Sequence, residues 1–85
     1  MTYDAVERIR REIWESINAH PRSRDELERE YGRVWSTPEL EEEFEVLGFL
    51  APFVVVRVRA TGLKGSLAFQ HSPRLYFDFR PDMEG

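Results

Sequence analysis

The chain has no cysteine among its 85 residues and a single lysine, Lys64, among its twelve basic side chains. Without thiols it can form no disulfide, iron–sulfur cluster or cysteine-based zinc site. It also has no apolar run of eighteen residues and no signal-peptide pattern at its polar start, so we expect no membrane span and a cytoplasmic location. Its length allows a single hydrophobic core and leaves no room for a deep enzymatic cleft.

Motifs for nucleotides and metals are absent as well. The sequence contains no dinucleotide-binding fingerprint, phosphate-binding loop, zinc-metalloprotease motif or calcium-binding loop. Its only histidines, His20 and His71, make a poor metal site by themselves. We therefore expect neither a cofactor nor a metal ion.

The remaining composition is that of a folded domain, since 41% of the residues are hydrophobic and 13% are aromatic. We expect one compact domain over residues 1–81 and a flexible tail over 82–85. The net charge of −4 is unevenly distributed, because residues 1–50 are rich in acids whereas residues 51–80 carry five basic side chains and one acid, Asp78. The two halves are therefore expected to attract different partners, or each other.

Three helices are predicted in the first half of the chain. Residues 4–19 place an apolar stripe at helical spacing, formed by Val6, Ile9, Ile13, Trp14 and Ile17. Ser23 with Glu26 forms a capping box that starts a second helix, which Gly32 ends. Ser36 with Glu39 forms another, and this third helix is predicted to run through Phe44 and Leu47 to Gly48.

After Pro52 the apolar residues alternate, which is typical of strands with one buried face. We predict strands near 53–59, 66–70 and 74–80, with Leu75, Phe77 and Phe79 on the inner face of the last. The predicted fold is α+β, with three N-terminal helices packed on a three-stranded antiparallel meander in the order αααβββ.

The spacing of Leu27, Gly32, Thr37 and Phe44, followed by Gly48-Phe49-Leu50, resembles the core of winged helix-turn-helix domains. The resemblance covers residues 4–70 and implies that the third helix is the recognition helix, followed by a hairpin wing. That helix carries five glutamates, at positions 39, 41, 42, 43 and 45, where such domains present basic or amide side chains to DNA. With this charge, it is not expected to read DNA.

A polar, basic surface is predicted on the outer face of the sheet, with its hairpin and turn. Its candidate binding residues are Arg57, Arg59, Lys64, Gln70, His71, Arg74, Tyr76 and Arg80. Arginines around a tyrosine are typical of single-stranded nucleic-acid platforms, but an antiparallel sheet often has one solvated polar face on which acids and arginines pair. A protein partner or an anionic ligand is a further reading of the same face.

Several alternatives stay open for the charged and apolar segments. The glutamate cluster is expected to be solvated, to pair with Arg22, Arg24, Arg29 and Arg33, to dock on a basic partner, or to dock on the basic sheet of a second copy. Phe53 and Val55 form an apolar pair on the outer face that is a candidate contact patch.

We favour a small non-catalytic binding or regulatory module that acts through the basic face on a protein partner or on itself. Nucleic acid binding by the same face and wing is the first alternative. A small hydrolase or transferase centred on His71 is the second, although no pattern places a base against a nucleophile.

Overall fold

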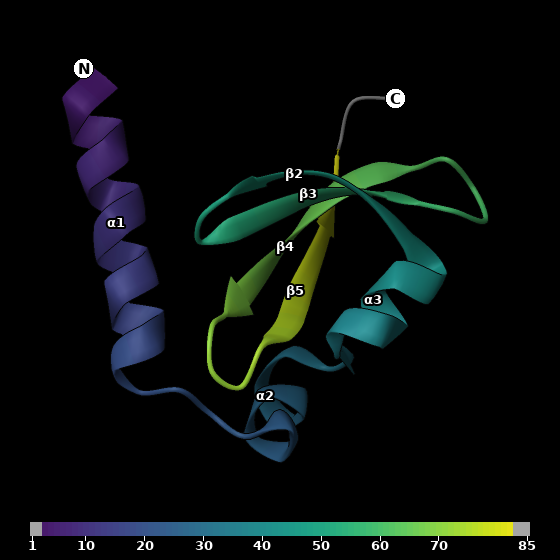
Figure 1. Ribbon diagram of the computed structural model, residues 1–85, viewed down its shortest axis with the longest axis horizontal. Coiled ribbons are helices and arrows are strands. Elements are labelled where there is room, and N and C mark those ends of the chain that lie inside the picture. The colour runs from purple at the N-terminus through teal and green to yellow at the C-terminus, as the bar shows by residue number, and fades with distance from the viewer. Residues whose placement is uncertain (1–2, 83–85) are drawn as a thin grey trace.

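The computed structural model describes residues 3–82, which form three helices and five strands (Figure 1). In chain order these are α1 (Tyr3–Ala19), α2 (Arg24–Tyr31), β1 (Val34–Trp35), α3 (Thr37–Glu43), β2 (Phe44–Leu50), β3 (Phe53–Val58), β4 (Lys64–Gln70) and β5 (Leu75–Pro81). The α+β class is confirmed. None of the described helices is long and apolar enough to span a bilayer.

Both predicted capping boxes are present. The Ser23 hydroxyl accepts a hydrogen bond from the Glu26 amide at 3.2 Å, and the Glu26 carboxylate accepts one from the Ser23 amide at 3.0 Å. Ser36 and Glu39 make the same reciprocal pair at the start of α3. Gly32 ends α2 with a φ of +85°, in the region that favours glycine. Local signals therefore set where these helices begin and where α2 ends.

The predicted extent of the third helix is wrong. α3 ends at Glu43, and residues 44–50 form strand β2, which pairs with β3 through a tight turn at Ala51-Pro52. The spacing of Leu40, Phe44 and Leu47 fits a helix, but strand pairing places Phe44 opposite Val58 and Phe49 opposite Val54. These cross-strand apolar contacts extend the core, which outweighs the local helical preference.

The predicted three-stranded meander and the order αααβββ are also wrong. The sheet has five antiparallel strands in the order β1-β5-β4-β3-β2, because β2 and the two-residue β1 add one strand at each edge. The three predicted strands lie at its centre as β3, β4 and β5. The short β1 was missed because two residues are too few to show a period.

Both faces of the sheet are buried, whereas the predicted meander had one face buried and the other in solvent. Phe69, on one face, belongs to the α3-side cluster, and Ala68, on the other, belongs to the α2-side cluster. The α3-side cluster consists of Trp35, Leu40, Phe44, Val54, Val56, Leu67, Phe69 and Tyr76. The α2-side cluster consists of Leu27, Val34, Ala68, Leu75 and Phe77. Helices therefore cover the sheet from two sides.

A bulge in β5 changes which face its side chains reach. Asp78 and Phe79 stand opposite Leu67 alone, and Asp78 has a φ of 58°. Phe79 consequently packs on Phe44 at 5.3 Å between ring centroids, within the α3-side cluster, whereas Phe77 stays with the α2-side cluster. The prediction that Leu75, Phe77 and Phe79 share one face is wrong for this reason.

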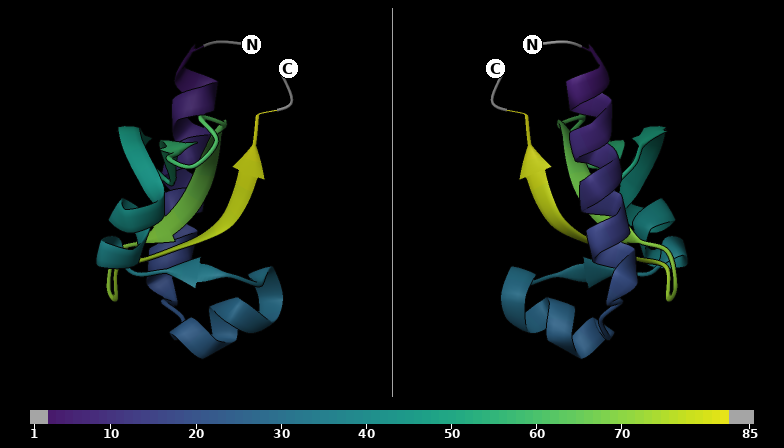
Figure 2. Two further views of the ribbon diagram at one scale, coloured as in Figure 1. Left: turned by 90° about the vertical axis from the view of Figure 1, so that its right-hand side faces the viewer. Right: turned by 90° about the vertical axis from the view of Figure 1, so that its left-hand side faces the viewer.

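Helix α1 lies along one side of the sheet and is joined to it by few contacts (Figure 2). The Trp14 ring packs on Phe69 at 4.9 Å, and the Arg10 Nε donates to the Ala51 carbonyl oxygen at 3.1 Å. The turn between β2 and β3 points toward the middle of α1 (Figure 1). The opposite end of the chain is also attached, since the Asp82 amide donates to the Lys64 carbonyl at 2.9 Å, whereas residues 83–85 of the predicted tail lie outside the described residues.

A substitution at Gly65 tests how tightly the chain packs around the bulge. A Cβ at this buried position would lie 2.6 Å from Phe79 Cε1 and 2.7 Å from the Arg80 carbonyl oxygen. Gly65→Ala should therefore lower the free energy of unfolding by about 1–3 kcal/mol through overpacking. Gly48→Ala is the matched control, because a Cβ there meets nothing within 4 Å. Urea unfolding followed by tryptophan fluorescence compares the two, and equal midpoints would contradict the packing described.

Candidate functional site

The eight predicted binding residues do not form one surface. Four of them lie near one end of the β4–β5 hairpin: Arg57, Arg59, Lys64 and Arg80. In the strand register there, Arg57 stands opposite Lys64 and Ser66 stands opposite Arg80. The other four lie near the turn that joins β4 to β5, where Gln70 pairs with Leu75. At about 3.3 Å per residue, the six steps from Lys64 to Gln70 separate the two groups by roughly 20 Å.

The first group is largely engaged within the domain. Arg57 pairs with Glu45 at 2.9 Å and Arg80 with Asp78 at 3.1 Å. The Arg59 Nε donates to the Glu41 carbonyl oxygen at 2.9 Å. These contacts match the alternative in which acids and arginines pair across a solvated face, and they offset the charge that a polyanion would need.

Gln70 and Tyr76 are buried, contrary to their predicted place on an exposed face; only 1% and 3% of their surfaces remain accessible. The Gln70 Nε2 donates to the carbonyls of Arg22 and Pro73 at 2.8 and 3.1 Å, and its Oε1 accepts from the Arg22 amide at 3.1 Å. Gln70 therefore ties the segment between α1 and α2 to the β4–β5 turn. The alternation along β4 correctly predicted that Gln70 lies on the same face as Ala68, but α2 covers that face.

His71 is exposed at the same turn, and its backbone amide donates to Asn18 Oδ1 at 2.7 Å. Within residues 3–82 its imidazole makes no hydrogen bond that would orient it as a base, and no group of three or more His, Asp or Glu side chains there could hold a metal ion. The turn is thus fixed through its backbone, from α1 on one side and from Gln70 on the other.

Arg74 is the last residue of this turn and lies against aromatic rings. Its guanidinium carbon is 4.9 Å from the centroid of Phe69, and its Nη1 donates to the Tyr76 hydroxyl at 3.4 Å. Beside it is a hollow of about 320 Å³, lined by Trp14, Phe49, Ala51, Phe69 and Arg74, which we call the arginine hollow. Three of the residues that line it are aromatic, so it combines an apolar wall with one positive charge.

Two of the four glutamates of α3 form ion pairs within the domain. Glu39 pairs with Arg24 at 2.7 Å, and Glu43 pairs with Arg33 while accepting a hydrogen bond from Trp35 Nε1 at 2.8 Å. The hydrogen bond from the Ser36 backbone, followed by the one from Arg24, lowers the pKa of Glu39. These contacts agree with the alternative in which the glutamates pair with the domain's own arginines.

A larger feature was missed from the sequence. Among residues 6–82, nine large hydrophobic side chains are exposed, and all but Leu63 belong to α1 or to the β2–β3 hairpin. We call these eight the apolar shoulder: Val6, Ile9, Ile13, Val46, Leu47, Phe49, Leu50 and Phe53. The α1 stripe was expected in the core, Leu47 was assigned to the third helix and Phe49 to the segment directly after it; of the eight, only Phe53 was predicted as part of a contact patch.

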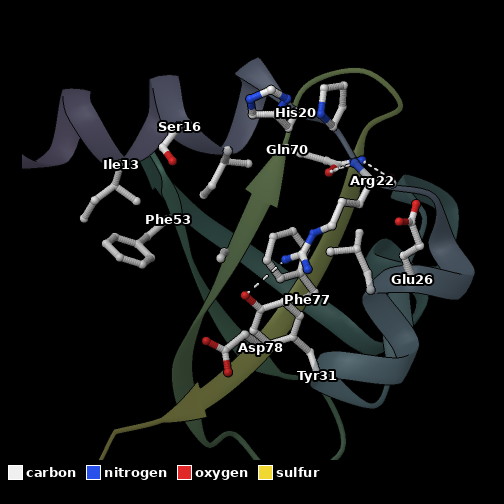
Figure 3. A pocket seen from close by; sticks show the side chains of 14 residues that line it. Ile13, Ser16, His20, Arg22, Glu26, Tyr31, Phe53, Gln70, Phe77 and Asp78 are labelled. Atoms are coloured by element: carbon white, nitrogen blue, oxygen red, sulfur yellow. Dashed lines mark hydrogen bonds between the residues drawn. The ribbon is translucent and has the colours of Figure 1, made fainter.

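The shoulder wraps around the edge of the sheet. Phe49 contacts Phe69 on the α3 side, with ring centroids 5.5 Å apart, whereas Leu50 pairs with Phe53, which pairs with Ala68 on the other face. Phe53 and Ile13 line one end of a groove of about 750 Å³ between α1, α2 and the sheet (Figure 3).

The far end of this groove is polar. Arg22 reaches toward Tyr31, with Nη2 at 3.3 Å from the hydroxyl, and Asp78 lies beside them (Figure 3). Arg22 forms an ion pair with Glu30, and the hydrogen bond between them raises the pKa of Arg22. The groove thus presents an apolar end that continues the shoulder and a polar end that is internally satisfied.

Comparisons with family models, curated protein sequences and solved structures gave no match. The resemblance to winged helix-turn-helix domains stays a prediction. Gly48-Phe49-Leu50, which carried part of it, lies in strand β2.

The role of Gln70 can be tested by replacing it with leucine, which removes three hydrogen bonds while keeping a similar volume. Because the backbone groups of Arg22 and Pro73 lose the partner that buried Gln70 provides, Gln70→Leu should lower the free energy of unfolding by about 2–3 kcal/mol. Arg80→Gln, at the exposed end of the sheet, should change it by less than about 0.5 kcal/mol. Chemical denaturation measures both, and equal effects would indicate that Gln70 is not a structural tie.

The lowered pKa of Glu39 predicts a dependence of stability on pH. The folded state binds the proton more weakly than the unfolded state, so the contribution of Glu39 is complete above its ordinary pKa of 4.5 and is lost as the pH falls toward the folded value. Glu39→Gln should flatten the fall in unfolding free energy below pH 4.5 relative to Glu42→Gln, a change on the same helix. If the unfolding free energies of the two variants fall identically with pH, the Glu39 carboxylate does not stabilise the start of α3 as described.

Proposed function

We propose that this domain is a non-catalytic module that binds a protein partner through the apolar shoulder. The observation that carries the proposal is that eight of the nine large hydrophobic side chains exposed within residues 6–82 lie on α1 and one hairpin. Scattered apolar side chains are ordinary on protein surfaces, whereas a connected apolar surface is typical of a binding site.

Contacts between the two parts of the shoulder support their acting together. The hydrogen bond from Arg10 to the Ala51 carbonyl holds α1 against the hairpin turn, and Ile13 and Phe53 line the same groove. A partner that spans α1 and the hairpin would therefore meet both sides at once. Aromatic and large aliphatic side chains of this kind supply most of the energy of protein interfaces.

The edge strand gives a second reason to favour a protein. β2 is a seven-residue edge of the sheet and carries Val46, Leu47, Phe49 and Leu50, with Glu45 as its only charged residue. Glu45 is paired with Arg57, so it does little to discourage strand pairing. Proteins commonly protect such edges with charge, proline or a covering element, and the other edge, β1, is only two residues long. The β2 edge is therefore suited to contact with another chain.

Charge distribution favours this surface over the basic face first predicted. Arg57 and Arg80 pair with acids of the same sheet, and the chain as a whole carries −4. Nucleic acid binding depends mainly on neutralising phosphates with free basic groups. A protein partner that covers apolar surface requires no such charge.

Photocrosslinking from single positions tests the proposal. A photoreactive residue at Ile9 or Leu50, in the full chain expressed in its native cells, should give one discrete protein adduct; the matched control is Leu63, which is 43% exposed but outside the shoulder. Introducing Phe49→Asp should remove the adduct while changing the free energy of unfolding by no more than about 1 kcal/mol, because 55% of Phe49 is already exposed.

Adducts of equal yield from Ile9 and Leu63, or adducts that survive Phe49→Asp, would overturn the proposal. An adduct that nuclease treatment shortens would show that the bound partner is a nucleic acid, and this result would also overturn the proposal. An adduct of twice the 10.1 kDa of the chain would identify the partner as a second copy.

A further inference from the structure

The arginine hollow lies where the shoulder meets the β4–β5 turn, and it contains a charge that the domain leaves unmatched. Arg10, Arg22, Arg24, Arg33, Arg57 and Arg80 each form an ion pair. Among the side chains of residues 6–82 no carboxylate lies within ion-pair distance of Arg74, although the domain carries a net negative charge. Arg74 is therefore available to an anionic group from outside.

The position of Arg74 is held from several directions. Asn18 fixes the turn through the His71 amide at 2.7 Å, and Gln70 fixes it through the Pro73 carbonyl at 3.1 Å. The guanidinium then rests over the Phe69 ring and donates to the Tyr76 hydroxyl. A guanidinium that stacks on one face still offers N–H groups at its edge, and a fixed fork of this kind suits a carboxylate.

Aromatic rings surround the charge. Phe69 lies at the centre, with its ring centroid 4.9 Å from Trp14, 5.5 Å from Phe49 and 5.8 Å from Tyr76. Phe49 is 55% exposed and Trp14 is half-buried, so both present ring surface to the hollow. An apolar side chain that fills the hollow would lie directly beside the Arg74 guanidinium.

A second positive charge lies next to the hollow. A smaller depression of about 230 Å³ shares Trp14 and Ala51 with it and is lined also by Glu7, Arg10 and Arg11. Glu7 and Arg10 form a pair, which leaves the exposed Arg11 as the unmatched charge among the residues lining this depression. The region around Trp14 is consequently positive on an acidic protein, which selects for negative ligands.

We infer that the arginine hollow binds an extended segment of the protein partner in which an acidic residue lies next to a large apolar residue. The carboxylate pairs with Arg74, and the apolar side chain packs against Trp14, Phe49 and Phe69. This inference rests on the proposed function, because Phe49 belongs to both the hollow and the shoulder. It specifies which side chains of the partner bind next to the shoulder.

The two tryptophans allow a sensitive test by ¹⁵N NMR. Trp14 lines the hollow, whereas Trp35 is buried and its indole N–H donates to Glu43, so the Trp35 signal is an internal control. The probe is a capped peptide with the core Leu-Asp-Phe, compared with the same peptide bearing Leu-Asn-Phe and with acetate alone. The aspartate peptide should shift the Trp14 indole signal, bind at least about 10-fold more tightly than the asparagine peptide, and weaken as salt is raised.

Variants of Arg74 locate the charge. Arg74→Gln should reduce binding of the aspartate peptide to the level of the asparagine peptide, and Arg74→Lys should retain part of the difference because it keeps the charge without the fork. Arg29→Gln, an exposed arginine of α2, is the matched control and should leave binding unchanged. Because Arg74 is exposed, the dispersion of the amide spectrum confirms that each variant is folded.

Equal binding of the two peptides, no shift at Trp14, or equal shifts of Trp14 and Trp35 would overturn the inference. If crosslinking from Ile9 still depends on Phe49 in that case, the proposed function stands and only the acidic segment is wrong. Binding of acetate as tight as that of the aspartate peptide would also overturn it, because the apolar neighbour would then contribute nothing.

Discussion

The burial of β4 on both faces constrains the rest of this small domain. Leu67 and Phe69 require cover on one side of the sheet, and Ala68 and Gln70 require it on the other. α2 meets one requirement through Leu27, and α3 with the β2 strand meets the other. An 85-residue chain has little further structure to distribute, so α1 lies at the side and keeps an apolar stripe in solvent.

The same constraint explains the division between charged and apolar surfaces. α2 and α3 lie close to the arginines at 22, 24 and 33, and their acids pair with these side chains. These ion pairs lie within residues 1–50 and leave the excess of acids in that half unchanged, whereas the pair of Arg57 with Glu45 joins the two halves. α1 and the β2–β3 hairpin expose large apolar side chains beside their charged ones, and Arg74 adds a positive charge at the boundary between the hairpin and the β4–β5 turn.

Local chemistry in the sequence predicted local structure well. The capping boxes at Ser23 and Ser36 and the end of α2 at Gly32 depend on neighbouring residues alone, and the structure confirms them. The alternating valines of β3 likewise predicted a strand. Phe44 to Leu50 fits both a helix and a strand, and only pairing with β3, which adds cross-strand contacts, decides between them.

The candidate site was harder to predict, for a related reason. Gln70 was placed on the correct face of its strand, whereas Tyr76 lies on the opposite face, beside Phe69 in the α3-side cluster. Both side chains are buried, because whether a face is wet depends on helices that pack there from elsewhere in the chain. The bulge at Asp78 shifts Phe79 to the opposite face without any glycine to indicate it. The exposure of Val6, Ile9 and Ile13 could not be found from their spacing, because the spacing is that of a buried stripe.

The sparse attachment of α1 has a consequence for motion. The helix is held by the Trp14 contact, the Arg10 hydrogen bond and the Asn18 hydrogen bond, while Pro21 and its neighbours link it to α2. Detaching it breaks these contacts and leaves the five-stranded ladder intact, so this segment is expected to open at a lower free energy than the whole domain unfolds. Amide protons of α1 should then exchange through local opening, and a partner that bridges helix and hairpin would slow exchange in that helix more than in the sheet.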